Sequence, residues 1–189
     1  MIPNREQAWN ILTEYTKGDA LLIHGKTVEG VMRHFAPLYG GDEEVWGAAG
    51  LLHDVDYEQW PHEHCKKMLE LLDEKGVDRA FSEQLASHGW GVCCDIEPVT
   101  DLAKVLYTID ELTGLIHAAA IMRPSKSVLD LELKSVRKKY KTKSFAAGVD
   151  RGIIEKGCEM IGRELDDVIE HCILGMREVA EKIGLKGEL

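Results

Sequence analysis

Apolar residues recur at helical spacing along almost the whole chain, and no segment shows the convincing two-residue alternation of a strand. For example, His24, Val28, Val31, Phe35 and Leu38 fall on roughly one face of a helix. A chain of 189 residues has the length of one domain with a single core. We therefore expect one all-α domain over residues 1–189, a bundle of about eight or nine helices.

Capping and helix-breaking residues divide this pattern into segments. Asn4 with Gln7 three residues later forms a capping signal, Asp42 caps another helix, and Pro124 follows the longest one. The expected helices with defined bounds cover about residues 4–18, 42–53, 64–75, 78–88, 101–122, 150–161 and 165–183. Another runs through His24 and ends at 40–41, and a basic helix is capped by Ser127 with Asp130. We expect the C-terminal helices, residues 127–185, to pack on the part of the chain at about 20–122.

Composition limits the function classes. The net charge of −10 argues against general nucleic-acid binding, because a protein that follows the phosphate backbone needs a positive surface. No apolar stretch has the length of a membrane span, and the first residues lack the apolar region of a secretory signal, which predicts a cytoplasmic protein. The five cysteines form no CxxC pair, which predicts reduced, mainly structural thiols.

The pair His53-Asp54 ends an apolar helix and carries the most chemical information. Side chains at adjacent helix positions diverge, so both reach one point only where the helix ends and the backbone turns. The loop that follows, residues 55–61, allows such a turn. An imidazole and a carboxylate together suit a first-row divalent metal ion, so we expect further ligands elsewhere in the chain.

Two more ligands come from the predicted helices on either side in the sequence. His24 lies on the apolar face of the preceding helix, which should pack antiparallel to the helix that ends at His53. Asp110 lies in the longest helix on a face shared with Ala103 and Leu106, where a carboxylate is costly to bury unless it is paired or binds a metal. A boundary position or an ion pair with a lysine or arginine would explain Asp110 equally well.

The order His24, His53-Asp54, Asp110 resembles the signature of the HD-domain phosphohydrolases. The segments 48–54, 109–114, 134–141 and 146–151 are similar to a small subgroup of predicted hydrolases in that superfamily. The resemblance implies an all-helical fold, a bound divalent metal ion and hydrolysis of phosphoesters or phosphoanhydrides. The metal would be Mn, Fe, Co, Ni, Zn or Mg, with one or two ions bound.

Two features depart from the common family pattern. Val55-Asp56-Tyr57 replaces the usual Ile-Gly after the His-Asp pair, and the Gly-Tyr-Pro extension of cyclic-dinucleotide phosphodiesterases is missing. The missing extension argues against a second-messenger diesterase.

His64 and His88 match the positions at which larger HD sites add a second metal ion, with Asp54 as the bridge. His64 could instead be an ordinary residue at a helix start, and His88 a core or capping residue. We assign Asp54, Asp56 and Glu58 to the catalytic set, the last two as candidate acids that exchange protons with the water or the leaving group. Asp56 and Glu58 could equally be solvated loop residues.

A basic segment follows the longest helix. Nine basic and only three acidic residues lie between positions 123 and 151, in a chain that is acidic as a whole. Arginine and lysine clusters bind phosphate oxygens, so we assign Arg137 and Lys138, near the centre of the segment, to substrate binding. The alternative is an ordinary solvated helix face.

The expected function is divalent-metal-dependent hydrolysis of a small phosphorylated metabolite or nucleotide. Two alternatives remain at this point. One is a di-iron oxygenase, which some members of the superfamily are, and the other is a non-catalytic HD domain that binds a nucleotide. The sequence leaves the substrate, the native metal and the oligomeric state open.

Overall fold

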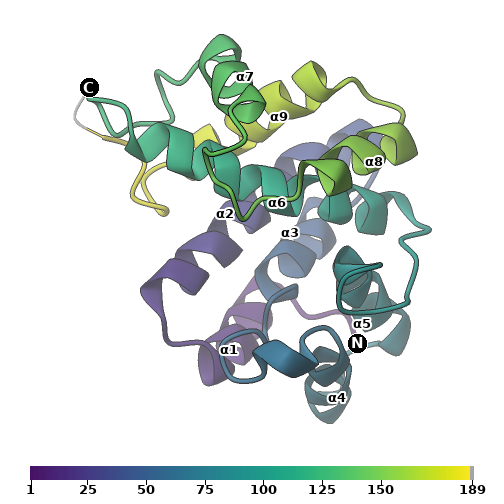
Figure 1. Ribbon diagram of the computed structural model, residues 1–189. Coiled ribbons are helices and arrows are strands. Elements are labelled where there is room, and N and C mark those ends of the chain that lie inside the picture. Colours follow the sequence, from purple (N-terminus) through teal and green to yellow (C-terminus); the bar gives the residue numbers. More distant parts are fainter. Residues whose placement is uncertain (188–189) are drawn as a thin grey trace.

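The computed structural model describes residues 1–187 and confirms the all-α prediction. Nine α-helices and three short 3₁₀ helices (η) make up this part of the chain, with one isolated bridge between Trp90 and Cys94 and no strand (Figure 1). The elements are α1 (Arg5–Tyr15), α2 (Asp19–Phe35), η1 (Ala36–Tyr39), α3 (Glu43–Leu52), η2 (Pro61–Glu63), α4 (Lys66–Glu74), α5 (Arg79–Ala86), η3 (Ser87–Gly89), α6 (Asp101–Ile121), α7 (Leu133–Lys141), α8 (Arg151–Ile161) and α9 (Leu165–Glu178).

The predicted caps of two helices are present, and a third helix also has a side-chain cap. Asn4 and Gln7 form a complete capping box at the start of α1. The Asp42 carboxylate accepts from two backbone amides of α3, and the Thr100 hydroxyl accepts from Ala103 N at the start of α6. Each cap satisfies amide groups that have no partner inside the helix, so the sequence fixes where these helices begin.

Helices α2, α3 and α6 form the centre of the molecule. Helix α2 packs against α3, α6 and α9, while α6 also packs against α8 (Figure 1). At the α2–α3 crossing a Cβ atom on Gly50 would lie 2.7 Å from the backbone nitrogen of Glu29, so glycine is needed for this close approach. The close packing places the C-terminal end of α3 beside α2.

Two predicted helix starts are wrong. Helix α4 begins at Lys66 rather than at residue 64, because His64 is extended and Cys65 has a positive φ of 66°. The basic helix α7 begins at Leu133, and the Ser127 hydroxyl donates instead to the carbonyls of Leu185 and Lys186. Ser127 therefore connects the start of the basic segment to the C-terminal residues.

Within residues 1–187, no helix combines the length and the apolar character needed to cross a membrane. The longest helix, α6, has the length but carries Lys104, Asp110 and Glu111 along its course.

Candidate metal centre

His24, His53, Asp54 and Asp110 meet at one point between α2, α3 and α6. His24 Nε2 lies 3.1 Å from His53 Nε2 and 2.9 Å from Asp110 Oδ1. His53 Nε2 lies 3.3 Å from Asp110 Oδ1 and 3.4 Å from Asp54 Oδ2. Three elements far apart in the sequence thus bring two imidazole nitrogens and two carboxylate oxygens together, and we call this set position 1.

The end of α3 explains how adjacent residues face the same point. His53 is the C-cap of α3, and Val55 N donates to Leu52 O in the turn that follows. The backbone therefore leaves the helix between His53 and Asp54, as the spacing of this pair requires.

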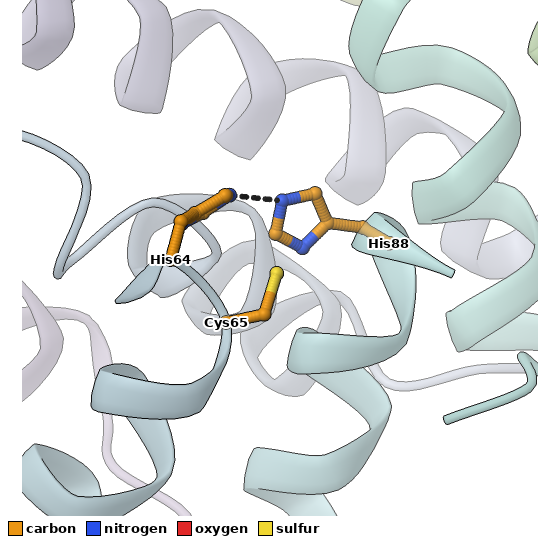
Figure 2. Close-up of side chains that lie close together, drawn as sticks. All are labelled: His64, Cys65 and His88. Atoms are coloured by element: carbon orange, nitrogen blue, oxygen red, sulfur yellow. Dashed lines mark hydrogen bonds between the residues drawn. The ribbon is translucent and has the colours of Figure 1, made fainter. Parts of the chain in front are cut away.

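A second group forms on the other oxygen of Asp54. His64 Nε2 and His88 Nε2 each lie 3.4 Å from Asp54 Oδ1 and 3.1 Å from one another. Figure 2 shows the two rings pointing toward each other from the segment before α4 and from η3. We call this set position 2, and Asp54 is shared by both positions.

The opposite ring nitrogens are held by acceptors. His53 Nδ1 lies 2.8 Å from Gly50 O, His88 Nδ1 lies 2.7 Å from Leu85 O, and His64 Nδ1 lies 2.7 Å from a carboxylate oxygen of Asp56. A neutral imidazole that donates through Nδ1 presents a lone pair at Nε2. At position 2 two lone pairs would then face each other at 3.1 Å, an arrangement that a cation between them would stabilise.

The distances fit a first-row divalent ion. Metal–nitrogen and metal–oxygen bonds of about 2.0–2.2 Å place neighbouring ligand atoms about 3.0–3.5 Å apart in octahedral or tetrahedral geometry. The group His24, His53 and Asp110 can hold such an ion, and so can the group His64, Cys65 and His88. The imidazole and carboxylate donors suit Zn, Fe, Mn, Co or Ni better than they suit a soft monovalent ion.

The charges of the site are strongly coupled. Burial alone would lower the pKa of His53, but the carboxylates of Asp54 and Asp110 raise it well above its usual value. Burial would also lower the pKa of His88, but a hydrogen bond with the Asp54 carboxylate raises it. Burial alone would raise the pKa of Asp54 and of Asp110, yet the surrounding histidines hold both below their usual value. The two carboxylates are thus anionic and favour positive charge between them and the imidazoles.

A cavity of about 420 Å³ opens onto both positions. His24, Asp54, His64, His88 and Asp110 contribute to its wall. The remaining lining residues in the described chain include no lysine or arginine; among them are Tyr57, Tyr107, Glu111, Val92, Cys93, Val149 and Ile153. A molecule in this cavity would therefore contact the metal-binding groups, two aromatic rings and an apolar wall.

Asp56 and Glu58 occupy places that differ from the predicted catalytic ones. Asp56 is fully buried, and its two oxygens accept from His64 Nδ1 and from Met68 N in the first turn of α4. Glu58 accepts from Lys17 N and Gly18 N at the start of α2, and these bonds lower its pKa. Neither side chain lines the cavity, because the turns after Asp54 direct one into the core and the other toward α2.

The structure does not bring Arg137 and Lys138 to the cavity. Arg137 Nε lies 2.7 Å from a carboxylate oxygen of Asp166, at the start of α9. Lys138 borders a separate hollow that is also lined by Met122, at the C-terminal end of α6. At 1.5 Å per residue this end lies about 18 Å along the helix from Asp110, which explains why α7 can pack on α6 without reaching the site.

Some lining residues were not identified from the sequence. Glu111 follows Asp110 and lines the cavity, where burial and the Asp110 charge raise its pKa. Tyr107 precedes Asp110 by three residues, a spacing that places both on one side of α6, and this spacing was the available signal. Cys93 had no such signal; a hydrogen bond with Cys65 lowers its pKa to about 6.

Across residues 1–187 the structure thus contains an all-helical bundle with two adjoining groups that can hold metal ions, one of two histidines with an aspartate and one of two histidines with a cysteine. No known protein family, no curated protein and no solved structure matches the chain.

Proposed function

We propose that this protein is a divalent-metal-dependent phosphohydrolase of the HD type, acting on a small phosphorylated metabolite or nucleotide. The observation that carries the proposal is the convergence of Nε2 atoms from four histidines on the two oxygens of Asp54. Asp110 completes position 1 at 2.9 Å from His24 Nε2. The resemblance of the ordered motif His24, His53-Asp54, Asp110 to the HD signature supports the same function.

The chain itself positions the donors. Asp54 offers Oδ2 to position 1 and Oδ1 to position 2, so one carboxylate can bridge two ions. The carbonyls of Gly50 and Leu85 and the Asp56 carboxylate hold three rings with Nε2 directed inward. Bound metal ions in such a site lower the pKa of a coordinated water and neutralise charge on the phosphoryl oxygens.

The cavity wall favours a substrate whose phosphate group is its main charge. Without a lysine or arginine among the lining residues in the described chain, the negative charge would be met at the metal positions. Tyr57 and Tyr107 offer aromatic surfaces, and Val92, Val149 and Ile153 offer apolar ones, to the rest of the molecule. A volume of about 420 Å³ suits a nucleotide or a similarly sized phosphate ester.

The test begins with metal analysis of protein purified without added metal. Release of inorganic phosphate is then measured over a panel of nucleotides and phosphorylated metabolites with Mn²⁺, Co²⁺, Ni²⁺, Zn²⁺ or Mg²⁺. We expect hydrolysis that a chelator abolishes and added metal restores. The matched variant His53→Ala should lose the activity at every metal tested.

Other results would contradict the proposal. A stoichiometric iron pair with a paramagnetic signal and consumption of oxygen, without phosphate release, would indicate the di-iron oxygenase. Tight binding of a nucleotide without turnover under all five metals would indicate a non-catalytic domain.

A further inference from the structure

Three cysteines gather beside position 2, at the back of the histidine pair. Cys65 Sγ lies 3.0 Å from Cys93 Sγ, and Cys94 Sγ donates to Ala86 O. Cys65 directly follows His64, and Figure 2 shows its sulfur lying beside the His88 ring. Cys65 Sγ lies close enough to His64 and His88 to serve as a third ligand at position 2, but that group does not include Cys93 and does not account for the contact between the two sulfurs.

The backbone at Cys65 adopts an unfavourable conformation. Its φ of 66° lies in the left-handed region, which an L side chain rarely adopts, and only two other non-glycine residues of the described chain share a positive φ. Such conformations cost about 1–3 kcal/mol and persist where the surroundings hold them in place. Here the conformation places a fully buried sulfur within contact distance of another.

The partner sulfur is presented by a tight turn. The amides of Val92, Cys93 and Cys94 all donate to Gly89 O. A Cβ atom on Gly89 would lie 2.2 Å from Cys93 Sγ and 2.6 Å from Cys65 Sγ, so only glycine leaves room for both. The turn thus holds Cys93 against Cys65, and Cys93 also lines the cavity, through which small molecules can reach it.

We propose that Cys65 and Cys93 form a redox modification site, at which a hydroperoxide converts the thiol pair into a disulfide. Closing the bond shortens the sulfur separation from 3.0 Å to about 2.05 Å, a small movement between residues that already touch. Cys65 is fully buried and Cys93 is partly exposed in the cavity wall, so Cys93 is the sulfur that meets the oxidant.

The chemistry has two balanced steps. The Cys93 thiolate attacks the terminal oxygen of the hydroperoxide, the O–O bond breaks, and hydroxide (or alkoxide) leaves, giving a sulfenic acid. The Cys65 sulfur then attacks the Cys93 sulfur, the S–O bond breaks, and water leaves with the thiol proton of Cys65. Two thiols are oxidised and one hydroperoxide is reduced. The product ties the residue after His64 to the loop that forms the cavity wall.

The test counts thiols and does not depend on enzymatic activity. Protein as purified is reduced, freed of reductant, treated with hydrogen peroxide, denatured and alkylated, and its intact mass is measured. All five cysteines are free in the starting structure, so we expect five alkylated residues before peroxide and three after it. Dithiothreitol should restore all five, and peptide mapping should join Cys65 to Cys93.

Variants make the assignment specific. Cys93→Ser and Cys65→Ser should lose no further thiols on oxidation, whereas Cys94→Ser, Cys158→Ser and Cys172→Ser should still lose two. If Cys65→Ser fails to fold, Cys65→Gly provides the same test, since glycine accepts the positive φ at this position. The proposal is overturned if the wild type keeps five alkylated residues, if Cys93→Ser still loses two, or if Cys93 gains two oxygens while Cys65 stays alkylated.

Discussion

The two metal positions share Asp54 but are built in different ways. Position 1 takes His24 and Asp110 from within the long helices α2 and α6, and the buried His53 from the end of α3. Position 2 takes His64 from an extended segment before α4 and His88 from the short helix η3. The Nδ1 atom of His64 is held by the carboxylate of Asp56, and its ring lies edge-on to Tyr57.

The arrangement of the ligands at position 1 therefore depends mainly on helix packing, and that at position 2 depends on a buried polar contact. A helix held along its length by apolar packing keeps its backbone in place, and at position 1 the only added anchor of a ring through Nδ1 in the described chain is the Gly50 carbonyl on the same helix as His53. A short segment lacks this support, so the orientation of its ligand depends on neighbouring polar groups. Changes to single polar residues should therefore affect position 2 more than position 1.

The largest effect is expected from Asp54→Ala, which removes the group common to both positions. Its two oxygens lie 3.4–3.6 Å from the Nε2 atoms of the four histidines, so both positions lose a ligand at once. We expect metal affinity to fall by more than about 100-fold at both positions, since even loss of a supporting contact costs about 10–100-fold. Metal analysis after dialysis measures this, and circular dichroism controls for folding. If the folded variant keeps the metal content of the wild type, the proposed metal centre is wrong.

The double variant His64→Ala/His88→Ala tests whether the positions are separate. Position 1 keeps all four of its groups, so the bound metal should fall from two ions to one per chain at saturating metal. The matched variant His24→Ala/His53→Ala should disturb position 1 instead. Calorimetric titration of metal-free protein counts the ions. A wild type that never binds more than one ion would rule out position 2 as a metal site.

Asp56→Asn tests most directly whether the ligands of the two positions are held in place in different ways. The amide can no longer offer a carboxylate oxygen to both His64 Nδ1 and Met68 N, so the imidazole loses its orientation. We expect affinity at position 2 to fall about 10–100-fold while position 1 changes little. Glu58→Gln is the control, because Glu58 binds the start of α2 and does not line the cavity. Equal losses at both positions would contradict the distinction.

The helices and their caps could be predicted because they depend on local information. Asn4 and Asp42 satisfy amides within a few residues of themselves, so their role is visible in the sequence. The start of α4 was wrong by two residues because the positive φ of Cys65 depends on its surroundings. The start of α7 was wrong because Ser127 bonds to carbonyls almost sixty residues later in the chain.

At the candidate site, too, features that depend on local sequence were predicted, whereas features that depend on tertiary packing were not. The six side chains predicted as metal ligands are brought together, since a His-Asp pair at a helix end and a carboxylate in an apolar helix are local signals. The roles of Asp56 and Glu58 depended on the direction of each turn after Asp54, which spacing does not define. The distance of α7 from the cavity depended on where along α6 the basic helix packs, a tertiary property.

Gly50→Ala tests the dependence of position 1 on packing. The new Cβ would lie 2.7–2.8 Å from backbone atoms of α2 at Val28 and Glu29, and backbone cannot rotate away as a side chain can. We expect a loss of about 1–3 kcal/mol in the free energy of unfolding, together with weaker binding at position 1. Denaturant unfolding and metal titration measure the two effects. Gly114→Ala is the control: apart from the adjoining turns of its own helix, no atom lies within 4 Å of its added Cβ, so stability should be equal or higher.

The smallest effect is expected from Arg137→Ala/Lys138→Ala, which lies outside both positions. Arg137 pairs with Asp166 in a partly exposed ion pair, and such pairs contribute about 0–1 kcal/mol to stability. Lys138 borders a hollow at the far end of α6, beyond the range over which a solvated charge acts at physiological salt, about 8 Å. We therefore expect unchanged metal content and an unchanged KM for an anionic substrate. A KM that rises several-fold and loses its salt dependence would instead show that the basic segment reaches the cavity mouth and takes part in phosphate binding.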